Sequence, residues 1–176
     1  IERTQPVRLV SEYYQNLTVI QLDAHADMRQ SYHGSNYNHA CVMARIHEKA
    51  PVVQAGIRSM DKDELPNMET SRVFWAHEMA GEDYHWIENL LEQLTSNVYI
   101  TIDLDVFDPS VMPSTGTPEP GGLSWYTVMK LLQKINQAVN ITGFDVVELC
   151  PHKENKAPDF MAAKLVYRLL SMCFNK

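Results

Sequence analysis

The sequence predicts an α/β domain in which helices pack against a layered sheet of parallel strands. Strand-like and helix-like segments alternate along the chain, which is the pattern of parallel strands joined by crossover helices. Two apolar, β-branched runs, 17–22 and 98–102, are interpreted as buried strands, and each leads directly into acidic residues. The 176 residues suffice for one core, so we expect residues 1–176 to form a single domain.

The first half of the chain is expected to contain two helices and three strands. β-Branched and aromatic residues mark the strands, and a segment with Gly34, Ser35 and Asn36 marks a loop. In chain order we expect a helix near residues 5–15, a strand at 17–22, a polar loop at 30–38, a helix at about 39–49, and strands at 52–58 and 72–75.

The second half is expected to contain three helices and two strands. Its first helix is amphipathic because apolar residues recur at spacings of three and four, and Ser124 is a favourable N-cap for the second. Prolines and glycines crowd residues 109–122, which indicates a long loop of a kind that often carries function. In chain order we expect a helix at 83–94, a strand at 98–102, this loop, a helix beginning at Ser124, a strand at 141–147 and a helix at about 158–173.

Composition and charge restrict the classes of partner. The formal net charge of −7 argues against nucleic acid and mildly favours cationic ligands. No apolar run is long enough to span a bilayer and no secretory signal opens the chain, so we expect no membrane partner. Cys41, Cys150 and Cys173 form neither a disulfide framework nor a zinc-binding spacing. We therefore expect reduced, mostly buried thiols in a cytoplasmic protein.

Acidic residues and one histidine gather where two predicted strands end. Asp23, His25 and Asp27 follow the first of these strands, and Asp103 and Asp105 follow the second. If strand geometry continues, alternate side chains point the same way, so each set would share one face. Two neighbouring strand ends would then bring four carboxylates and one imidazole together. Such a cluster would repel itself without a cation, and two divalent metals would neutralise it.

The donor types indicate which metal and which chemistry to expect. Oxygen ligands with one imidazole and no thiolate favour Mn²⁺ or Mg²⁺ over Zn²⁺. Two metals about 3.5–4 Å apart can share a hydroxide at neutral pH, which suits hydrolysis of an electrophilic carbon. Glu148 ends a third predicted strand and would lie at the same edge of the sheet. A helix cap or a loop hydrogen bond would explain the presence of any one of these residues. It is a poor explanation for five such residues that follow two strands.

These motifs resemble those of the ureohydrolases, the family of arginases, agmatinases and related amidinohydrolases. The resemblance extends over nearly the whole chain. It implies a three-layer α/β/α domain of the arginase/deacetylase type with a mostly parallel sheet, and hydrolysis of a guanidinium group to urea and an amine at a two-manganese centre. The segments that carry it are 23–27, 54–59, 102–109, 114–122, 145–148 and 162–165.

The resemblance also implies roles for single residues. Asp23 and Asp103 would bridge the two metals, Asp27 would complete one, and His25 with Asp105 the other. Asp27 would also hydrogen-bond the attacking metal-bound hydroxide.

Two further residues would handle substrate and protons. Glu148 would hold the guanidinium, since a carboxylate accepts two parallel N–H bonds from that planar cation. His39 matches the family histidine that shuttles protons near the site, and an imidazole can do this near neutral pH. A simple helix-capping role for His39 is the alternative, and His33 is a weaker candidate.

The segment 34–43 resembles agmatinases more than arginases. Arginases use Asn and Ser there to contact the amino-acid end of arginine, and neither follows Asp27 in that pattern. Agmatine, cleaved to urea and putrescine in polyamine biosynthesis, is therefore the first choice of substrate. Other guanidino or ureido amines remain open. Family resemblance also implies a homo-oligomer, a trimer or a hexamer.

The chain departs from the family at its beginning. Family members carry a Gly-Gly-Asp/Glu-His motif whose histidine binds one metal, and that histidine would fall at about Ile1 or just before it. Either the chain is a fragment, or it is a shortened form with one impaired metal site. We favour a fragment that is N-terminally truncated relative to the family, which would leave an exposed apolar edge or face on the sheet.

Two other functions stay open on sequence alone. A metal-poor, non-catalytic relative acting as a regulatory or oligomer partner would explain the absent histidine. A related Zn²⁺ deacetylase would share the fold, although such sites usually hold one metal and the paired aspartates here suit two.

Overall fold

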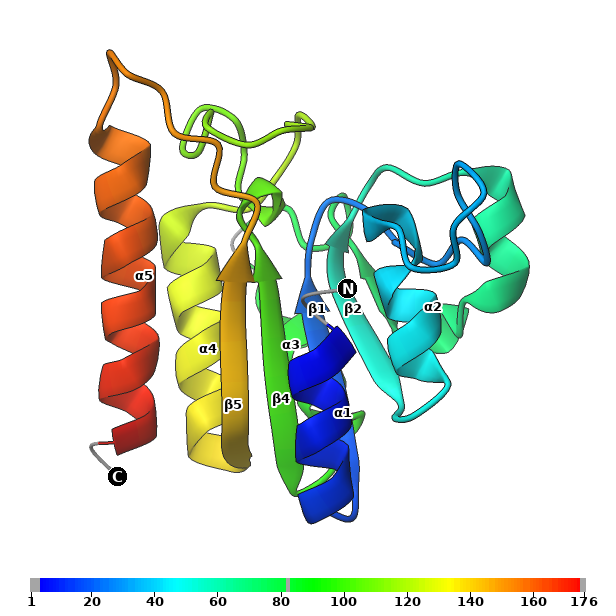
Figure 1. Cartoon of the computed structure of the whole chain (residues 1–176). Coiled ribbons are helices and arrows are strands. Elements are labelled where there is room, and N and C mark those ends of the chain that lie inside the picture. Colours follow the sequence, from blue (N-terminus) through cyan, green and yellow to red (C-terminus); the bar gives the residue numbers. More distant parts are fainter. Residues whose placement is uncertain (1–3, 82, 175–176) are drawn as a thin grey trace.

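In the part of the chain that the structure describes, five strands form one parallel sheet with helices on both faces (Figure 1). The structure is a computed structural model and describes residues 4–81 and 83–174. Short 3-10 helices η1 (His39–Cys41), η2 (Lys62–Asn67), η3 (Thr70–Arg72) and η4 (Leu104–Val106) lie in the connections. The main elements are α1 (Thr4–Tyr13), β1 (Leu17–Leu22), α2 (Val42–His47), β2 (Val52–Ile57), β3 (Val73–Trp75), α3 (His85–Glu92), β4 (Asn97–Asp103), α4 (Trp125–Ala138), β5 (Asn140–Val147) and α5 (Ala157–Phe174).

The strand order, β3-β2-β1-β4-β5, places β1 at the centre. Every neighbouring pair is parallel. β1 and β4 pair over their whole length, from Leu17 opposite Asn97 to Leu22 opposite Ile102. Because both strands run the same way, the residues that follow them meet at one edge of the sheet. This register brings Asp23 and Asp103 to the same place.

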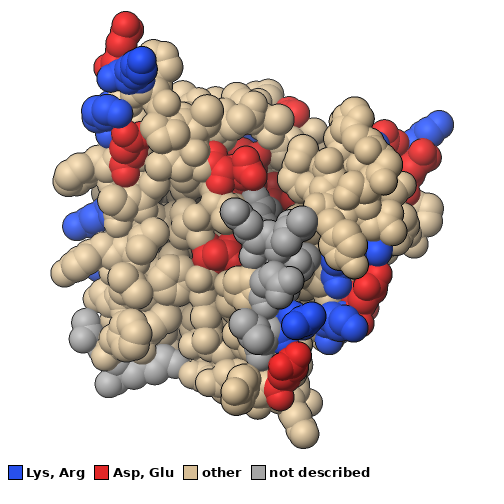
Figure 2. Space-filling view, in the orientation of Figure 1, with Lys and Arg blue, Asp and Glu red and all other residues tan. Residues whose placement is uncertain are grey.

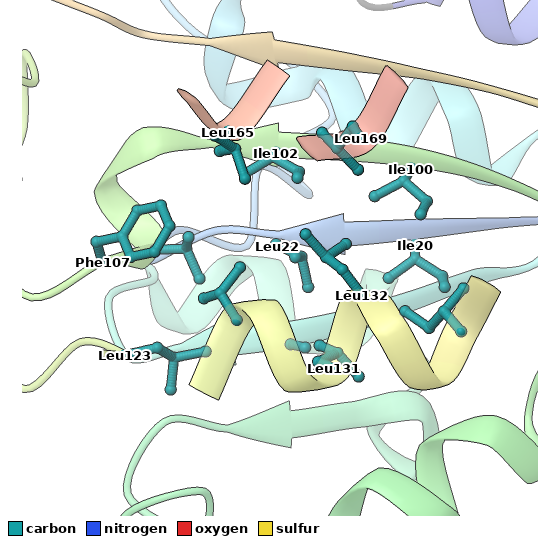
Figure 3. Packing of buried hydrophobic residues seen from close by; sticks show 14 of the residues in the cluster. Ile20, Leu22, Ile100, Ile102, Phe107, Leu123, Leu131, Leu132, Leu165 and Leu169 are labelled. Carbon is teal, nitrogen blue, oxygen red and sulfur yellow. The ribbon is translucent and has the colours of Figure 1, made fainter. Parts of the chain in front are cut away.

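Two apolar layers flank the sheet. On one face, strand residues such as Ile20 and Ile100 pack against α3, α4 and α5, as Figure 3 shows for Leu131, Leu132 and Leu165. On the other face, α1 and α2 cover a second cluster. Burial of every residue explains why β1 and β2 are mostly apolar and do not alternate between apolar and polar residues. The predicted three-layer α/β/α arrangement is confirmed.

Most predicted elements are present, and their ends differ where side chains cap them. Ser124 caps α4 as predicted, because its hydroxyl accepts a hydrogen bond from the Thr127 amide at 3.1 Å. The helix expected at 39–49 is shorter, since Asn38 accepts from the Ala40 amide and starts the 3-10 turn η1 first. The helix expected at 83–94 covers only His85–Glu92.

The thiols are free, but they are not mostly buried. Cys41 is buried, whereas Cys150 is exposed in the loop after β5 and Cys173 is half-buried near the end of α5. The expectation of buried thiols is therefore wrong for Cys150, because the chain leaves the sheet before that residue. Within the described parts of the chain, no helix combines the length and apolar character needed to cross a membrane.

β5 forms one edge of the described sheet and is less covered than the strands at its centre. Six of its eight residues are half-buried, whereas every residue of β1 is buried. Phe144 and Val146 pack partly against the core. β5 is thus a half-buried edge of the described sheet, and the exposed apolar edge expected of a truncated sheet stays a prediction.

Candidate metal centre

A cavity of about 360 Å³ opens at the carboxyl ends of the strands. Seven of the eight candidate site residues named from the sequence line it, and the weaker candidate His33 does not. Figure 2 shows acidic side chains gathered near the centre of the visible face, close to the ends of β4 and β5 in Figure 1. The lining residues are Asp23, His25, Asp27, Arg29, Tyr32, His39, Ala40, Asp103, Asp105, Gly116, Thr117 and Glu148.

The residues after β1 reach the cavity through a loop. Strand geometry ends at Leu22, and Asp27 has a left-handed backbone with φ of 54°. The expected period-two continuation of the strand is therefore wrong, although the predicted convergence of these side chains is correct. Asp23 is held by two hydrogen bonds, from the His25 amide at 2.8 Å and from the Gln21 side-chain amide at 2.8 Å.

Two buried glutamines support this loop, and sequence reasoning missed both. Gln54 donates to the Gln21 side-chain oxygen at 2.6 Å and to the Ala26 carbonyl at 2.8 Å. Gln21 in turn donates to Asp23 and to the His25 carbonyl. A polar amide inside an otherwise apolar strand was the available signal, because a buried amide needs partners.

The residues after β4 also leave strand geometry at once. Asp103 caps the 3-10 helix η4 by accepting from the Asp105 amide at 3.0 Å. This turn, and not a continued strand, brings Asp105 back toward β1. Asp105 accepts from the Ala24 amide at 3.0 Å, which ties the two strand ends together.

Three side chains converge closely enough to hold one metal ion. The ligand atoms of Asp23, His25 and Asp105 all lie within 4.8 Å of one another. His25 Nδ1 is 3.0 Å from an Asp105 carboxylate oxygen and 3.6 Å from one of Asp23. Hydrogen bonds to Asp105 and Asp23 raise the pKa of His25 to about 10. This group of two carboxylates and one imidazole stabilises positive charge and offers oxygen and nitrogen donors. It therefore fits a divalent metal.

The other two predicted ligands lie beside this group. Asp27 and Asp103 line the same cavity. The family histidine expected at about Ile1 lies outside the described residues. The described part of the chain thus brings five predicted ligands to one cavity, with three of them in close mutual contact.

The rim of the cavity is aromatic and basic. His39 is exposed, and its ring lies edge-on to Tyr32 at 6.1 Å between centroids. The Arg29 guanidinium lies over the Tyr32 ring and pairs with Asp61 at 3.1 Å. Sequence reasoning did not single out Arg29 or Tyr32, because neither belongs to a metal-binding pattern. Glu148, with φ of 64°, contributes a carboxylate from the end of β5.

Comparison with known proteins gives the family. The family model described as "Arginase family" matches residues 4–172. The chain belongs to the arginase family. An N(1)-aminopropylagmatine ureohydrolase of Synechocystis sp. is 42% identical over 157 residues, covering 87% of this chain and 51% of that protein. An agmatinase of Pyrococcus horikoshii is 38% identical over 156 residues, covering 87% of this chain and 54% of that protein.

A solved structure confirms the arginase-type α/β fold. The agmatine ureohydrolase of Thermoplasma volcanium superimposes with a TM-score of 0.81 at 30% identity, covering 97% of this chain and 59% of that chain. The chain thus spans about half the length of the curated relatives it matches.

Proposed function

We propose that this chain carries the metal centre of a ureohydrolase that hydrolyses a guanidino amine to urea and an amine. The observation that carries the proposal is the convergence of Asp23, His25 and Asp105 in a cavity also lined by His39 and Glu148. The names of the similar proteins support a guanidino compound as substrate.

Five side chains would hold two divalent metals, with Mn²⁺ as the expected ion. Asp23, Asp27, Asp103 and Asp105 would hold them through carboxylate oxygens, and His25 through an imidazole nitrogen. Bound metals would supply a Lewis acid and an activated water at neutral pH. The fixed carboxylates of Asp23 and Asp105 support this role. The Ala24 amide holds one oxygen of Asp105 and leaves the other toward His25, and both oxygens of Asp23 accept hydrogen bonds, from the His25 amide and the Gln21 side chain.

Glu148 would bind the guanidinium of the substrate. Its carboxylate can accept two parallel N–H bonds from that planar cation. His39 would hold a proton at the exposed rim and deliver it to the leaving amine nitrogen. Its exposure at the mouth of the cavity supports exchange of that proton with solvent.

Agmatine is the first substrate proposed, and aminopropylagmatine is the second. The sequence identity of 42% to an N(1)-aminopropylagmatine ureohydrolase favours this longer amine as a second candidate substrate. The exposed rim around His39 supports it too, because an extended tail could leave the cavity there without crossing the core.

Urea release tests the proposal. The chain is incubated with Mn²⁺ and either amine, alongside Asp103→Asn and the exposed control Asp83→Asn. We expect urea from the unaltered chain and from the control, and at least about 100-fold less from Asp103→Asn, because a metal ligand is lost.

Two results would count against the proposal. A chain with measured bound manganese that releases urea from neither amine would contradict the hydrolase function. Fewer than one manganese per chain at saturation would instead favour a metal-poor, non-catalytic relative.

A further inference from the structure

Glu119 faces the side of His25 that points away from Asp105. Its carboxylate oxygen accepts a hydrogen bond from the Ser59 hydroxyl at 3.0 Å. The same oxygen lies 3.9 Å from His25 Nε2. His25 thus has carboxylates on both nitrogens, with Asp105 at Nδ1 and Glu119 beyond Nε2.

Arg58 fixes the backbone on which Glu119 sits. Its guanidinium donates to the carbonyls of Glu119 at 2.9 Å and Asp105 at 2.6 Å. Further bonds reach the carbonyls of Gly56 and Pro120. One half-buried cation therefore joins the end of β2, the turn after β4 and the loop that carries Glu119. The positions of Asp105 and Glu119 relative to each other are set by this clamp.

The two nitrogens of a metal-binding imidazole have different requirements. If Nδ1 binds the metal, Nε2 must carry the hydrogen, and that hydrogen needs an acceptor to fix the ring. Among the described residues, Glu119 has a carboxylate oxygen 3.9 Å from His25 Nε2. Ser59 leaves its second oxygen and further lone pairs available for this purpose.

We propose that Glu119 is a positioning residue that orients His25 for metal binding through Nδ1. This inference rests on the proposed function, because it assigns a partner to a ligand of the same centre. The 3.9 Å separation shortens to hydrogen-bond length, about 2.9 Å, when the ring turns onto a metal. Ser59 holds the carboxylate ready, and Arg58 keeps its backbone in place.

Mn²⁺ affinity tests the role independently of catalysis. The chain and its Glu119→Ala, Glu119→Gln and Ser59→Ala variants are titrated with Mn²⁺, and free Mn²⁺ is followed by electron paramagnetic resonance. The matched control is Glu88→Gln, since Glu88 is exposed on α3. We expect Glu119→Ala to weaken one manganese site by about 10–100-fold, the usual effect of losing such an outer carboxylate.

The conservative variants separate orientation from simple stability. Glu119→Gln keeps an acceptor oxygen and should retain most of the Mn²⁺ affinity. The Mn²⁺ affinity of Ser59→Ala should lie between that of Glu119→Gln and that of the unaltered chain. The metal-free Glu119→Ala protein should unfold at the unaltered temperature, since the Arg58 bond to its backbone carbonyl remains.

Three results would overturn the inference. The first is Mn²⁺ affinity of Glu119→Ala within about twofold of the unaltered chain. The second is an equal loss of Mn²⁺ affinity in Glu119→Gln and Glu119→Ala, together with a lowered unfolding temperature of both metal-free variants. That result would mean that Glu119 has a structural role. The third is an unaltered chain that binds no Mn²⁺, in which case the proposed function fails as well. If the unaltered chain binds Mn²⁺ and releases urea but the variants give the first or the second result, only the role of Glu119 fails.

Discussion

Backbone amides hold the acidic side chains of this site in place before any cation arrives. Asp23 accepts from the amide of His25, Asp103 from that of Asp105, and Asp105 from that of Ala24. Each carboxylate is thus oriented by its own local turn, and the cost of burying it is partly offset. The negative charge of Asp105 and Asp23 favours the protonated form of His25. The stability of the metal-free protein should therefore depend on pH.

Metal-free stability should fall at alkaline pH because of His25. The folded pKa is raised from 6.5 to about 10, so the stabilisation is fully present below about pH 6.5 and is lost as pH rises through about 10. Free energies of unfolding are measured in urea with chelator at several pH values for the unaltered chain and His25→Gln. The difference between the two should shrink across this range, and the exposed control His77→Gln should show no such change. A constant difference would contradict the assignment.

Replacing Glu148 should impair substrate binding and leave metal binding intact. Losing a charged pair with the guanidinium costs about 1.5–3 kcal/mol, so Glu148→Gln should lower kcat/KM for agmatine by about 10–100-fold. Mn²⁺ titration should be unaltered. Glu154→Gln, an exposed neighbour in the following loop, serves as the control. Equal activity of Glu148→Gln and Glu154→Gln would show that Glu148 does not contact the substrate.

At the scale of elements, the loop between β4 and α4 is fixed to the site by close backbone contacts. Asp108 accepts from the amides of Ser110, Gly121 and Gly122 and from the Ser110 hydroxyl, and these bonds lower the pKa of its carboxyl to about 2. A Cβ on Gly122 would lie 2.5 Å from the Asp108 amide nitrogen and 2.7 Å from the Arg58 guanidinium. Only glycine permits this approach.

A side chain at position 122 should therefore open the loop. Gly122→Ala should destabilise the protein by about 1–3 kcal/mol, the usual cost of forcing atoms into a packed region. It should also weaken Mn²⁺ binding, because Arg58 then loses its fixed contacts. Gly116→Ala is the matched control, since a Cβ there meets nothing within 4 Å. Equal unfolding free energies for the two variants would contradict the proposed clamp.

The sequence predicted the helices and strands better than the residues at which they end. The ends depend on side-chain hydrogen bonds within single turns. Apolar runs sufficed for β1, β4 and α4 because burial decides those segments. In the turns after β1 and β4, Asp23 and Asp103 accept hydrogen bonds from the backbone amides two residues on, and a rule of strand alternation does not predict these bonds. The five predicted ligands therefore reach one cavity, but the local geometry predicted for the two turns is wrong.

The supporting residues were harder to find because their partners are distant in sequence. Gln54 acts on a residue 33 positions earlier, and Arg58 on a carbonyl 61 positions later. Neither residue belongs to a pattern of ligands. Only the folded sheet brings these donors to their acceptors.

At the scale of the whole molecule, the core between the sheet and α3, α4 and α5 positions the site. Leu165 of α5 is fully buried in that core, opposite the strands β1 and β4. Leu165→Ala should cost about 2–5 kcal/mol in free energy of unfolding, since a cavity remains. Leu170 on the same helix is 41% exposed, and Leu170→Ala should cost much less. Similar losses in urea denaturation would contradict the placement of α5.

The parallel sheet makes the position of the site a consequence of topology. β1 and β4 are neighbours that run in one direction, so their acidic ends meet at the carboxyl edge. This is where open α/β sheets bind ligands in general. We infer that these two strand ends together form a cage for divalent metal.

Anomalous diffraction from crystals of the chain soaked in Mn²⁺ tests that claim most directly. We expect a manganese peak bounded by the carboxylates of Asp23 and Asp105 and by His25 Nδ1, with a second peak on the side of Asp27 and Asp103. Manganese found only elsewhere on the protein, with this cavity free of anomalous density at saturating Mn²⁺, would contradict it.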